Sequence, residues 1–302
     1  MDNCKKKHSI DGHTKIFGLI GNPVGHTLSP VLHNTLAEFY GHNLIYGAFP
    51  VTEDPMKAVE GAYALGIGGL NVTVPHKSAV MPALVEIDDF ALKIGAVNTL
   101  VRVEGKGYKG YNTDMPGLYR AMEQEGIQIS GETIVILGAG GAARAVAMMT
   151  ASKGAARVYV LNRTPGKAQA IVSEIRSFYP ECQMTAGSLS DSSRLPDGKF
   201  LCIQATSIGM SPNVDRAVIE DPAFYERIHT GFDLVYNPYD TKFMQLVRQA
   251  GGRAYNGLNM LLYQGVIAYE LWNEMEVGAE AVDRVRQRLK KEMGLSDETA
   301  GD

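Results

Sequence analysis

A glycine-rich turn between an apolar strand and a helix constrains this chain more than any other stretch. The run Ile134–Leu137 is β-branched or aliphatic, which is typical of a parallel strand buried on both faces. Gly138, Gly140 and Ala143 follow with the spacing G-x-G-x-x-A, which allows a tight turn, a close approach of the backbone to a pyrophosphate, and tight helix packing. The stretch predicts a dinucleotide site at a helix start, although an ordinary strand-to-helix turn would also explain one such motif.

The end of the next predicted strand indicates which dinucleotide would bind. The strand Arg157–Leu161 runs into Asn162, Arg163 and Thr164, and Lys167 follows. An NAD-binding turn normally carries an acidic residue about 20 residues past the glycines, where it holds the ribose 2′-hydroxyl. A cation at this point suits the 2′-phosphate of NADP instead. We therefore predict NADP as the cofactor.

Length, charge and cysteine usage narrow the class of protein. A chain of 302 residues suits two domains, and a net charge of -4 gives no electrostatic reason to expect nucleic acid or an anionic membrane as partner. No apolar run of about 18 residues occurs, and no apolar signal segment follows the basic residues 5–7, so we predict a cytoplasmic protein. The scattered Cys4, Cys182 and Cys202 indicate free thiols in a reducing compartment. Histidines and cysteines lack metal-ligand spacing, so we predict no metal site.

Strands and helices alternate along the chain, which predicts parallel α/β architecture. Between loose ends at 1–14 and 296–302, the patterns predict strands at 15–20, 44–49, 69–74, 98–103, 134–137, 157–161, 201–204 and 231–235, a hairpin after residue 103, and helices at 31–40, 54–65, 78–85, 89–94, 115–125, 258–273 and 278–293. We predict an N-terminal α/β substrate domain, residues 1–114 completed by 259–302, and a Rossmann-type doubly wound NADP-binding domain, residues 115–258. The C-terminal helices return to the first domain, whose edge strands would permit a homodimer without requiring one.

Two polar clusters follow early strands, where an open α/β sheet binds its ligands. Thr27 and Ser29 precede Pro30, so Ser29 is a good N-cap with proline at N1. The two hydroxyls beside a helix N-terminus would equally bind a small carboxylate. Lys77 follows a strand that Pro75 stops; it is either a solvated surface charge or a partly desolvated lysine suited to proton transfer.

Two further clusters allow the same two interpretations. Asn98, in the stretch Gly95–Thr99, is either a turn residue or a group that binds substrate hydroxyls. Asp114 either caps a helix that begins at Met115 or faces the ligand. Neither cluster alone distinguishes a structural role from a ligand-binding role.

Taken together, these stretches resemble the shikimate/quinate dehydrogenase family. The matching segments occur in the family's order and span nearly all of the chain: 21–23 with 27–30, 71–77, 95–99, 112–114, 138–143, 162–164, 236–238 and 257–264. The resemblance implies that Lys77 and Asp114 form the catalytic pair and that Thr27 and Ser29 hold a substrate carboxylate. It implies substrate-site roles for Asn71, Thr73, Asn98, Tyr236 and Gln264, and cofactor-binding roles for Gly138, Ala139, Gly140, Gly141, Ala142, Ala143, Asn162, Arg163, Thr164, Lys167 and Gly257.

The implied reaction is the NADP-dependent, reversible reduction of 3-dehydroshikimate to shikimate, a step of aromatic amino acid biosynthesis in the chorismate pathway. A lysine ammonium would stabilise the developing alkoxide and donate the proton, and we expect it to titrate as a coupled pair with Asp114. Two residues depart from the family pattern, since serine is common at Thr27 and glycine at Met115. Thr27 leaves open a quinate/shikimate dehydrogenase that acts on quinate, with NADP or NAD. A non-catalytic NADPH-binding regulator is a further alternative, which the presence of both members of the pair disfavours.

Overall fold

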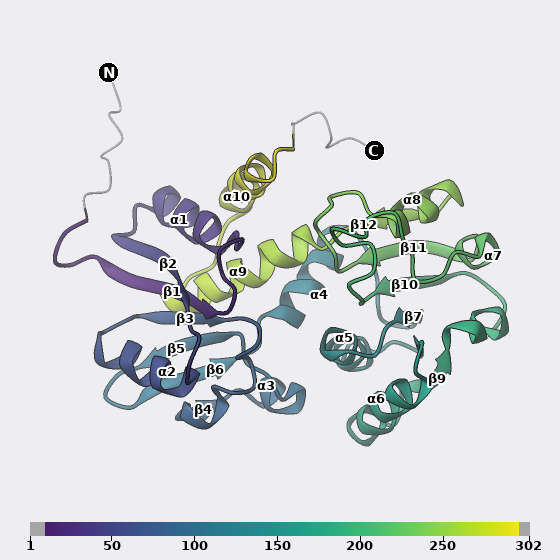
Figure 1. Ribbon diagram of the computed structural model, residues 1–302, viewed down its shortest axis with the longest axis horizontal. Coiled ribbons are helices and arrows are strands. Elements are labelled where there is room, and N and C mark those ends of the chain that lie inside the picture. Colours follow the sequence, from purple (N-terminus) through teal and green to yellow (C-terminus); the bar gives the residue numbers. More distant parts are fainter. Residues whose placement is uncertain (1–9, 296–302) are drawn as a thin grey trace. The chain divides into compact units, whose positions relative to one another are not determined.

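The computed structural model describes residues 10–295, which form two compact units (Figure 1). Unit 1 contains the described residues up to Gly117 and from Leu262, and unit 2 contains Leu118–Leu261. The predicted thiol of Cys4 and the basic residues 5–7 lie outside the described residues, as do residues 296–302. The prediction of a loose end as far as residue 14 is wrong for residues 11–14. Thr14 Oγ1 donates to Asn43 Oδ1 at 2.8 Å, and Asn43 Nδ2 donates to Asp11 Oδ1 at 3.1 Å, which ties this segment to the start of a strand.

Unit 1 is built on a six-stranded mixed sheet in the order β2-β1-β3-β5-β6-β4. The strands are β1 (Lys15–Gly21), β2 (Leu44–Pro50), β3 (Gly69–Val72), β4 (Glu86–Ile87), β5 (Thr99–Val103) and β6 (Gly107–Tyr111). β1 pairs in parallel with β2 and β3, whereas β5 is antiparallel to β3 and β6. The predicted hairpin after residue 103 is therefore confirmed. β2 and β4 are the edges of this sheet, and the homodimer stays a prediction.

The helices of unit 1 come from both ends of the chain. They are α1 (Ser29–Tyr40), α2 (Pro55–Ala64), α3 (Asp89–Ile94), most of α9 (Leu258–Asn273) and α10 (Ala279–Glu292). α9 reaches the sheet through Trp272, whose Nε1 donates to the Leu100 carbonyl at 2.9 Å. Gly69 makes room for this ring, because a Cβ there would lie 2.3 Å from Trp272 Nε1. The predicted return of the C-terminal helices to the first domain is confirmed.

The predicted helix at 78–85 is wrong. Only Met81–Ala83 forms a helical turn, the 3-10 helix η1, and its neighbours are turns. The bonds there run from residue i to residue i−3, from Ala83 N to Val80 O and from Leu84 N to Met81 O. Pro82 has no N–H to donate, so an α-helix cannot continue through this segment.

Unit 2 is a doubly wound α/β unit with a fully parallel sheet in the order β12-β11-β10-β7-β8-β9. Its strands are β7 (Thr133–Leu137), β8 (Arg157–Asn162), β9 (Gln183–Ser188), β10 (Phe200–Gln204), β11 (Ile228–Asp233) and β12 (Arg253–Tyr255). Its helices are α5 (Gly141–Ser152), α6 (Pro165–Phe178), α7 (Pro222–Tyr225) and α8 (Lys242–Gln249), with the 3-10 helix η2 (Leu189–Arg194); α4 (Asp114–Gln124) links the units.

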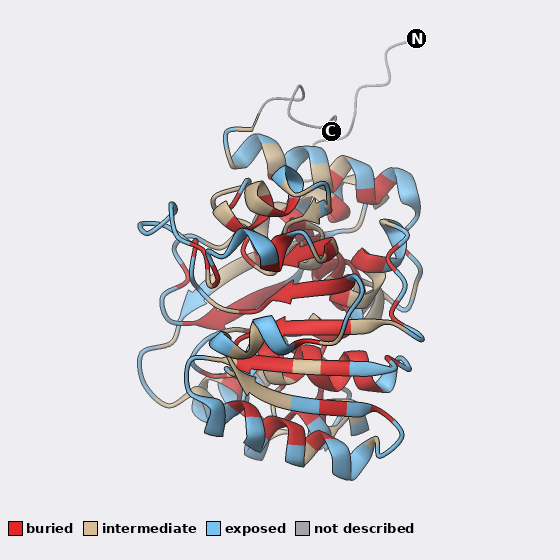
Figure 2. Ribbon diagram, turned by 90° about the vertical axis from the view of Figure 1, so that its right-hand side faces the viewer, coloured by how far each residue is buried: buried red, intermediate tan, exposed pale blue. Residues whose placement is uncertain are grey.

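The strand order of unit 2 places its ligand site. The chain runs outward from β7 through β8 to β9 and then returns to β10 on the other side of β7, so the strand order reverses between β7 and β10. Dinucleotides bind outside the carboxyl ends of the strands at such a switch point. Residues Ile134–Leu137 of β7 are fully buried, as the sequence predicts for a central parallel strand. Figure 2 shows the buried residues concentrated in the strands and the exposed ones on the outer faces of the helices. Within residues 10–295, no helix has the length and apolar character to cross a membrane.

Candidate active site

The centre of the site in unit 1 is an ion pair between Lys77 and Asp114. Lys77 Nζ lies 2.5 Å from Asp114 Oδ2, and the two side chains are 30% and 20% exposed. The other carboxylate oxygen, Oδ1, accepts a hydrogen bond of 2.8 Å from Asn98 Nδ2. Both oxygens of Asp114 thus have a donor, and the pair keeps contact with solvent. A solvated surface lysine would not need this arrangement.

Local structure holds both members of the pair in place. Lys77 lies in the turn that follows β3, where its carbonyl accepts from Val97 N at 2.9 Å. The preceding His76 is buried, and its Nε2 lies 2.9 Å from the Val51 carbonyl. Asp114 is the first residue of α4 and bonds Lys77 and Asn98 instead of serving as a cap before the helix. Met115, which departs from the family pattern, is 2% exposed and so offers almost no surface to a ligand.

Asn98 and Asn71 belong to one buried hydrogen-bond network. Asn98 Oδ1 accepts from Thr113 N at 2.7 Å, from Thr113 Oγ1 at 3.1 Å and from Thr99 Oγ1 at 3.2 Å. Asn71 Nδ2 donates to the Asn98 carbonyl and to Thr99 Oγ1, both at 3.1 Å. Asn98 is therefore no isolated turn residue: three hydrogen bonds to Oδ1 orient its side chain, with Nδ2 pointing at the carboxylate of Asp114.

The first hydroxyl cluster does not cap α1. Ser29 is the first residue of the helix itself, the N-cap is Leu28, and no side chain caps the helix. Thr27 Oγ1 donates to Ser29 Oγ at 3.2 Å, and Ser29 N donates to Thr27 Oγ1 at 3.3 Å. The N-cap interpretation of Ser29 is thus wrong, because the helix starts one residue earlier than that role requires. The two hydroxyls lie together beside a helix N-terminus that has no acidic residue in its first turn.

Thr73 and Gln264 also belong to unit 1. Thr73 follows β3, its N donates to the Ile20 carbonyl at 2.9 Å, and its hydroxyl makes no hydrogen bond within the described residues. Gln264 lies on α9, whose backbone passes close to the first turn of α4: a Cβ at Gly117 would lie 2.5 Å from Gln264 N. Unit 1 therefore contains Lys77, Asp114, Thr27, Ser29, Asn71, Thr73, Asn98 and Gln264.

Tyr236 belongs to unit 2, in the segment that follows β11, and its role beside the unit 1 residues stays a prediction. Burial raises the pKa of its phenol. The segment is fixed by Asp233, which accepts from Thr241 Oγ1 at 2.7 Å, from Val235 N at 2.9 Å and from Gln204 Nε2 at 3.2 Å. Burial raises the pKa of Asp233 to about 7. Gly257 bonds the same segment, since its N donates to the Val235 carbonyl at 3.1 Å.

The glycine turn of unit 2 fits a pyrophosphate. Gly138 has φ +120°, and a Cβ there would lie 2.9 Å from Thr206 Cγ2, so the turn requires glycine. Gly140 is the N-cap of α5, no side chain caps the helix, and its first turn carries no acidic residue. A Cβ at Gly140 or Gly141 would meet nothing within 4 Å, so open space adjoins the start of the helix. Residues 138–143 could therefore hold the pyrophosphate of NADP on the helix N-terminus.

The loop after β8 offers free cations at the predicted place. Asn162 Nδ2 donates to the Thr164 carbonyl at 3.0 Å, which shapes the loop before α6. Arg163, Thr164 and Lys167 are exposed, and the side chains of Arg163 and Lys167 have no ion-pair partner within residues 10–295. An arginine in this state can bind a phosphate with several charge-assisted hydrogen bonds.

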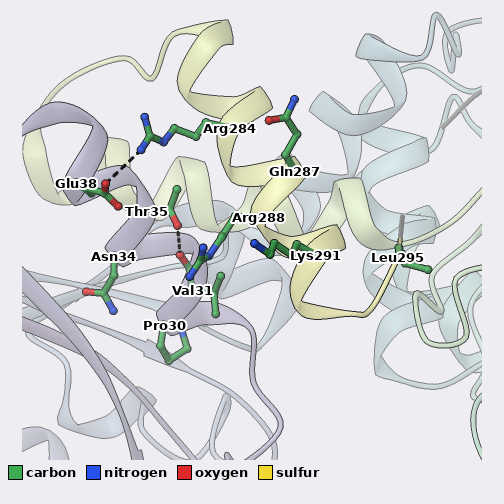
Figure 3. Close-up of a pocket in the computed structure, with 10 residues that line it drawn as sticks. All are labelled: Pro30, Val31, Asn34, Thr35, Glu38, Arg284, Gln287, Arg288, Lys291 and Leu295. Atoms are coloured by element: carbon green, nitrogen blue, oxygen red, sulfur yellow. Dashed lines mark hydrogen bonds and ion pairs between the residues drawn. The ribbon is translucent and has the colours of Figure 1, made fainter. Parts of the chain in front are cut away.

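A pocket of about 850 Å³ lies elsewhere in unit 1, between α1 and α10 (Figure 3). Arg284 pairs with Glu38 there at 3.2 Å, and Arg288 and Lys291 add positive charge. No residue of the predicted active site lines this pocket, so it is no part of that site. No cluster of three or more metal-ligand side chains occurs in the part of the chain that the structure describes.

Sequence reasoning missed three polar residues that support the site. Thr99 and Thr113 bond the Asn98 side chain, and Tyr46 of β2 donates to Asn71 Oδ1 at 2.7 Å. Thr99 and Thr113 lie inside matching stretches of the sequence, so their position gave a signal. No signal in the sequence pointed to Tyr46, because β1 lies between its strand, β2, and the strand of Asn71, β3.

Comparison with known proteins agrees with this geometry. Residues 19–100 match the shikimate dehydrogenase substrate binding domain, residues 120–192 match shikimate / quinate 5-dehydrogenase, and residues 257–289 match the shikimate 5′-dehydrogenase C-terminal domain. The shikimate dehydrogenase (NADP(+)) of Moorella thermoacetica is 40% identical over 293 residues, which cover 95% of this chain and 96% of that relative.

Solved structures show the same likeness. A shikimate dehydrogenase in complex with NADP⁺ superimposes with a TM-score of 0.84 at 37% identity, covering 94% of this chain and 97% of that one. The shikimate 5-dehydrogenase from Listeria monocytogenes, in complex with shikimate and NAD, gives a TM-score of 0.85 at 31% identity, covering 93% and 98%. The chain therefore belongs to the shikimate dehydrogenase family.

Proposed function

We propose that this protein catalyses the NADP-dependent, reversible reduction of 3-dehydroshikimate to shikimate. The observation that carries the proposal is the Lys77–Asp114 pair, which Asn98 orients. The pair occurs in a chain of the shikimate dehydrogenase family. The hydroxyls of Thr27 and Ser29 would bind the substrate carboxylate, and Asn71, Thr73, Asn98, Tyr236 and Gln264 would contact its ring. We assign substrate binding to unit 1 and NADP binding to unit 2.

Bound NADPH supplies the hydride. Residues 138–143 would hold its pyrophosphate, and Asn162, Arg163, Thr164 and Lys167 would hold its 2′-phosphate. Gly257 would also contact the cofactor. The guanidinium of Arg163 is exposed and has no ion-pair partner within residues 10–295. This supports NADP over NAD, because a phosphate dianion gains more from such a group than a hydroxyl does.

Lys77 and Asp114 have different roles in the proton transfer. Negative charge develops on the carbonyl oxygen during reduction, and the Lys77 ammonium stabilises that charge and then donates a proton to it. Asp114 keeps the ammonium in place through the 2.5 Å contact and is itself held by Asn98 Nδ2. In the oxidation of shikimate, Lys77 returns to the role of base.

Steady-state kinetics of Lys77→Ala test this assignment. We expect the KM for shikimate to stay within roughly tenfold and kcat to fall about 100- to 10,000-fold, because the lysine acts mainly in the transition state. Lys109→Ala is a matched control, since Lys109 pairs with Glu86 in the same unit away from the site. A Lys77→Ala enzyme with near-normal kcat would refute the catalytic role of the lysine.

Quinate is a second candidate substrate, which Thr27 leaves open. The methyl group of Thr27 lies next to the proposed carboxylate site. Quinate differs from shikimate at this end of the molecule, because its carboxylate-bearing carbon has an added hydroxyl. Assays of shikimate and quinate, each with NADP and with NAD, separate the two substrates and the two cofactors. If none of the four combinations is turned over, the proposal is wrong and the alternative of a non-catalytic NADPH-binding regulator is favoured.

A further inference from the structure

Tyr46 is fixed at three points inside unit 1. Its main chain is bound by Asn34 of α1: Asn34 Nδ2 donates to the Tyr46 carbonyl at 3.0 Å, and Tyr46 N donates to Asn34 Oδ1 at 2.9 Å. Its ring stacks on His33 with centroids 4.2 Å apart and planes at 21°. Its hydroxyl donates to Asn71 Oδ1 at 2.7 Å. Figure 3 shows Asn34 on α1 at the edge of the neighbouring pocket.

The surroundings of Tyr46 restrict its hydroxyl to hydrogen bonding, with Asn71 as the partner it donates to and Ser29 as a second polar neighbour. Tyr46 is 4% exposed and His33 is 1% exposed, so water has almost no access. Burial keeps the phenol protonated by raising the Tyr46 pKa well above its usual value, and it lowers the pKa of His33 to about 3. The neutral imidazole has no hydrogen-bond partner in the described part of the chain and contacts Tyr46 as a flat ring.

The partners of Asn71 determine which way its amide points. Nδ2 lies 3.1 Å from the Asn98 carbonyl, which can only accept, so the NH₂ group must be on that side. Its second hydrogen goes to Thr99 Oγ1, also at 3.1 Å. Oδ1 therefore faces Tyr46, whose hydroxyl has to donate. Both hydrogens of Asn71 are used within the protein, and only one lone pair on Oδ1 is left for a ligand.

This arrangement connects Tyr46 to the catalytic pair. Asn71 bonds the carbonyl of Asn98 and the hydroxyl of Thr99, and Asn98 Nδ2 bonds the carboxylate of Asp114. Neighbouring members of such a chain orient one another, and a buried group that loses its partner costs more than the bond itself contributes.

We propose that Tyr46 is a positioning residue that fixes Asn71 as a pure hydrogen-bond acceptor for a ring hydroxyl of the substrate. The inference rests on the proposed function, because it assigns Asn71 to the ring of shikimate. Asn71 then selects a hydroxyl over a keto group at the ring position that it contacts, since a keto oxygen has no hydrogen to donate to it.

Tyr46→Phe tests the proposal, because it removes the hydroxyl and keeps the ring stacked on His33. The KM for shikimate should rise about 3- to 15-fold, the range that one lost hydrogen bond gives, while kcat and the KM for NADP stay within about threefold. Tyr108→Phe is the matched control. Tyr108 is 1% exposed in the same unit, and its hydroxyl donates to the Ile67 carbonyl at 2.7 Å, away from the polar network.

Two further measurements separate positioning from a general loss of structure. In an Asn71→Ala background, Tyr46→Phe should change the KM for shikimate by less than about twofold, because its effect passes through the missing amide. In the full-length protein without substrate, exchange of the Asn71 side-chain amide hydrogens, followed by NMR, should be faster in Tyr46→Phe and unchanged in Tyr108→Phe.

Each outcome decides one point. Equal KM changes in Tyr46→Phe and Tyr108→Phe, or an Asn71 amide that exchanges at the wild-type rate in Tyr46→Phe, would overturn the inference. If the wild-type protein does not turn over shikimate, the proposed function fails, and the exchange measurement still tests whether Tyr46 positions Asn71.

Discussion

Asp233 should make the stability of unit 2 fall as the pH rises. Its side chain is fully buried, and its hydrogen-bond donors are the neutral groups of Thr241, Val235 and Gln204. Burial raises the Asp233 pKa from 3.8 to about 7. Between these values the folded state holds a proton that the unfolded state has lost, so this stabilising contribution is complete below pH 3.8 and is lost as the pH rises through about 7.

The size of the effect follows from the same pKa values. One pKa unit corresponds to about 1.4 kcal/mol, so the full interval sets an upper limit of about 4 kcal/mol. Local relaxation and water entry reduce the cost of the buried charge, and we expect a loss of about 2 to 4 kcal/mol between pH 4 and pH 8. Asp233→Asn removes the titration and keeps an oxygen that can accept from Val235 N.

Urea unfolding of the full chain between pH 5 and pH 8 measures this effect. Far-UV circular dichroism follows the whole protein, and the single tryptophan, Trp272, reports unit 1 separately. His33 titrates in the opposite sense: its lowered pKa removes stability as the pH falls from 6.5 toward about 3. His33 is present in both proteins, so its contribution cancels in their difference. The Asn variant should gain stability relative to wild type as the pH rises; parallel pH profiles would refute the reasoning.

Two further substitutions test close packing and cofactor choice. Gly117→Ala should destabilise the protein by about 1 to 3 kcal/mol, because its Cβ would lie 2.5 Å from Gln264 N. Gly61→Ala should stabilise it by about 0.5 to 1 kcal/mol, because a Cβ there would meet nothing within 4 Å. Equal stabilities of the two variants in thermal unfolding would contradict the packing. Arg163→Ala should raise the KM for NADP about 10- to 100-fold and leave the KM for NAD within about twofold. Arg176→Ala, on α6, is the control. Equal changes for both cofactors would show that Arg163 does not bind the 2′-phosphate.

Much of unit 2 could be predicted because its signals are local. The strand at Ile134–Leu137, the glycine turn and the helix after it lie within one short stretch, and the parallel sheet follows from strands that alternate with helices. The predicted helix at 78–85 failed where Pro82 interrupts hydrogen bonding. A pattern of apolar residues cannot reveal this when the segment is short.

The site was predictable as a set of residues but not as a network. Asn98 precedes β5, Asp114 begins α4 and Lys77 lies in the turn that follows β3, so their place in the candidate site could be inferred from position. The side chain of Asn98 is held by Thr99 and Thr113, and that of Asn71 by Tyr46. The contacts with Thr113 and Tyr46 join residues 15 and 25 positions apart in the sequence. Ser29 shows the same limit, since a shift of one residue in the helix start changed its role from cap to first helical residue.

The division of the chain between the units also determines the order in which a nascent protein can fold. Unit 2 is continuous, so all of its residues have left the ribosome once Leu261 has emerged. Unit 1 still lacks Trp272, which bonds the Leu100 carbonyl, and Tyr269, whose hydroxyl lies 2.7 Å from His42 Nδ1. When Leu261 has emerged, unit 2 can therefore fold, whereas the unit that carries Lys77 and Asp114 completes its core only after the residues of α9 and α10 have followed.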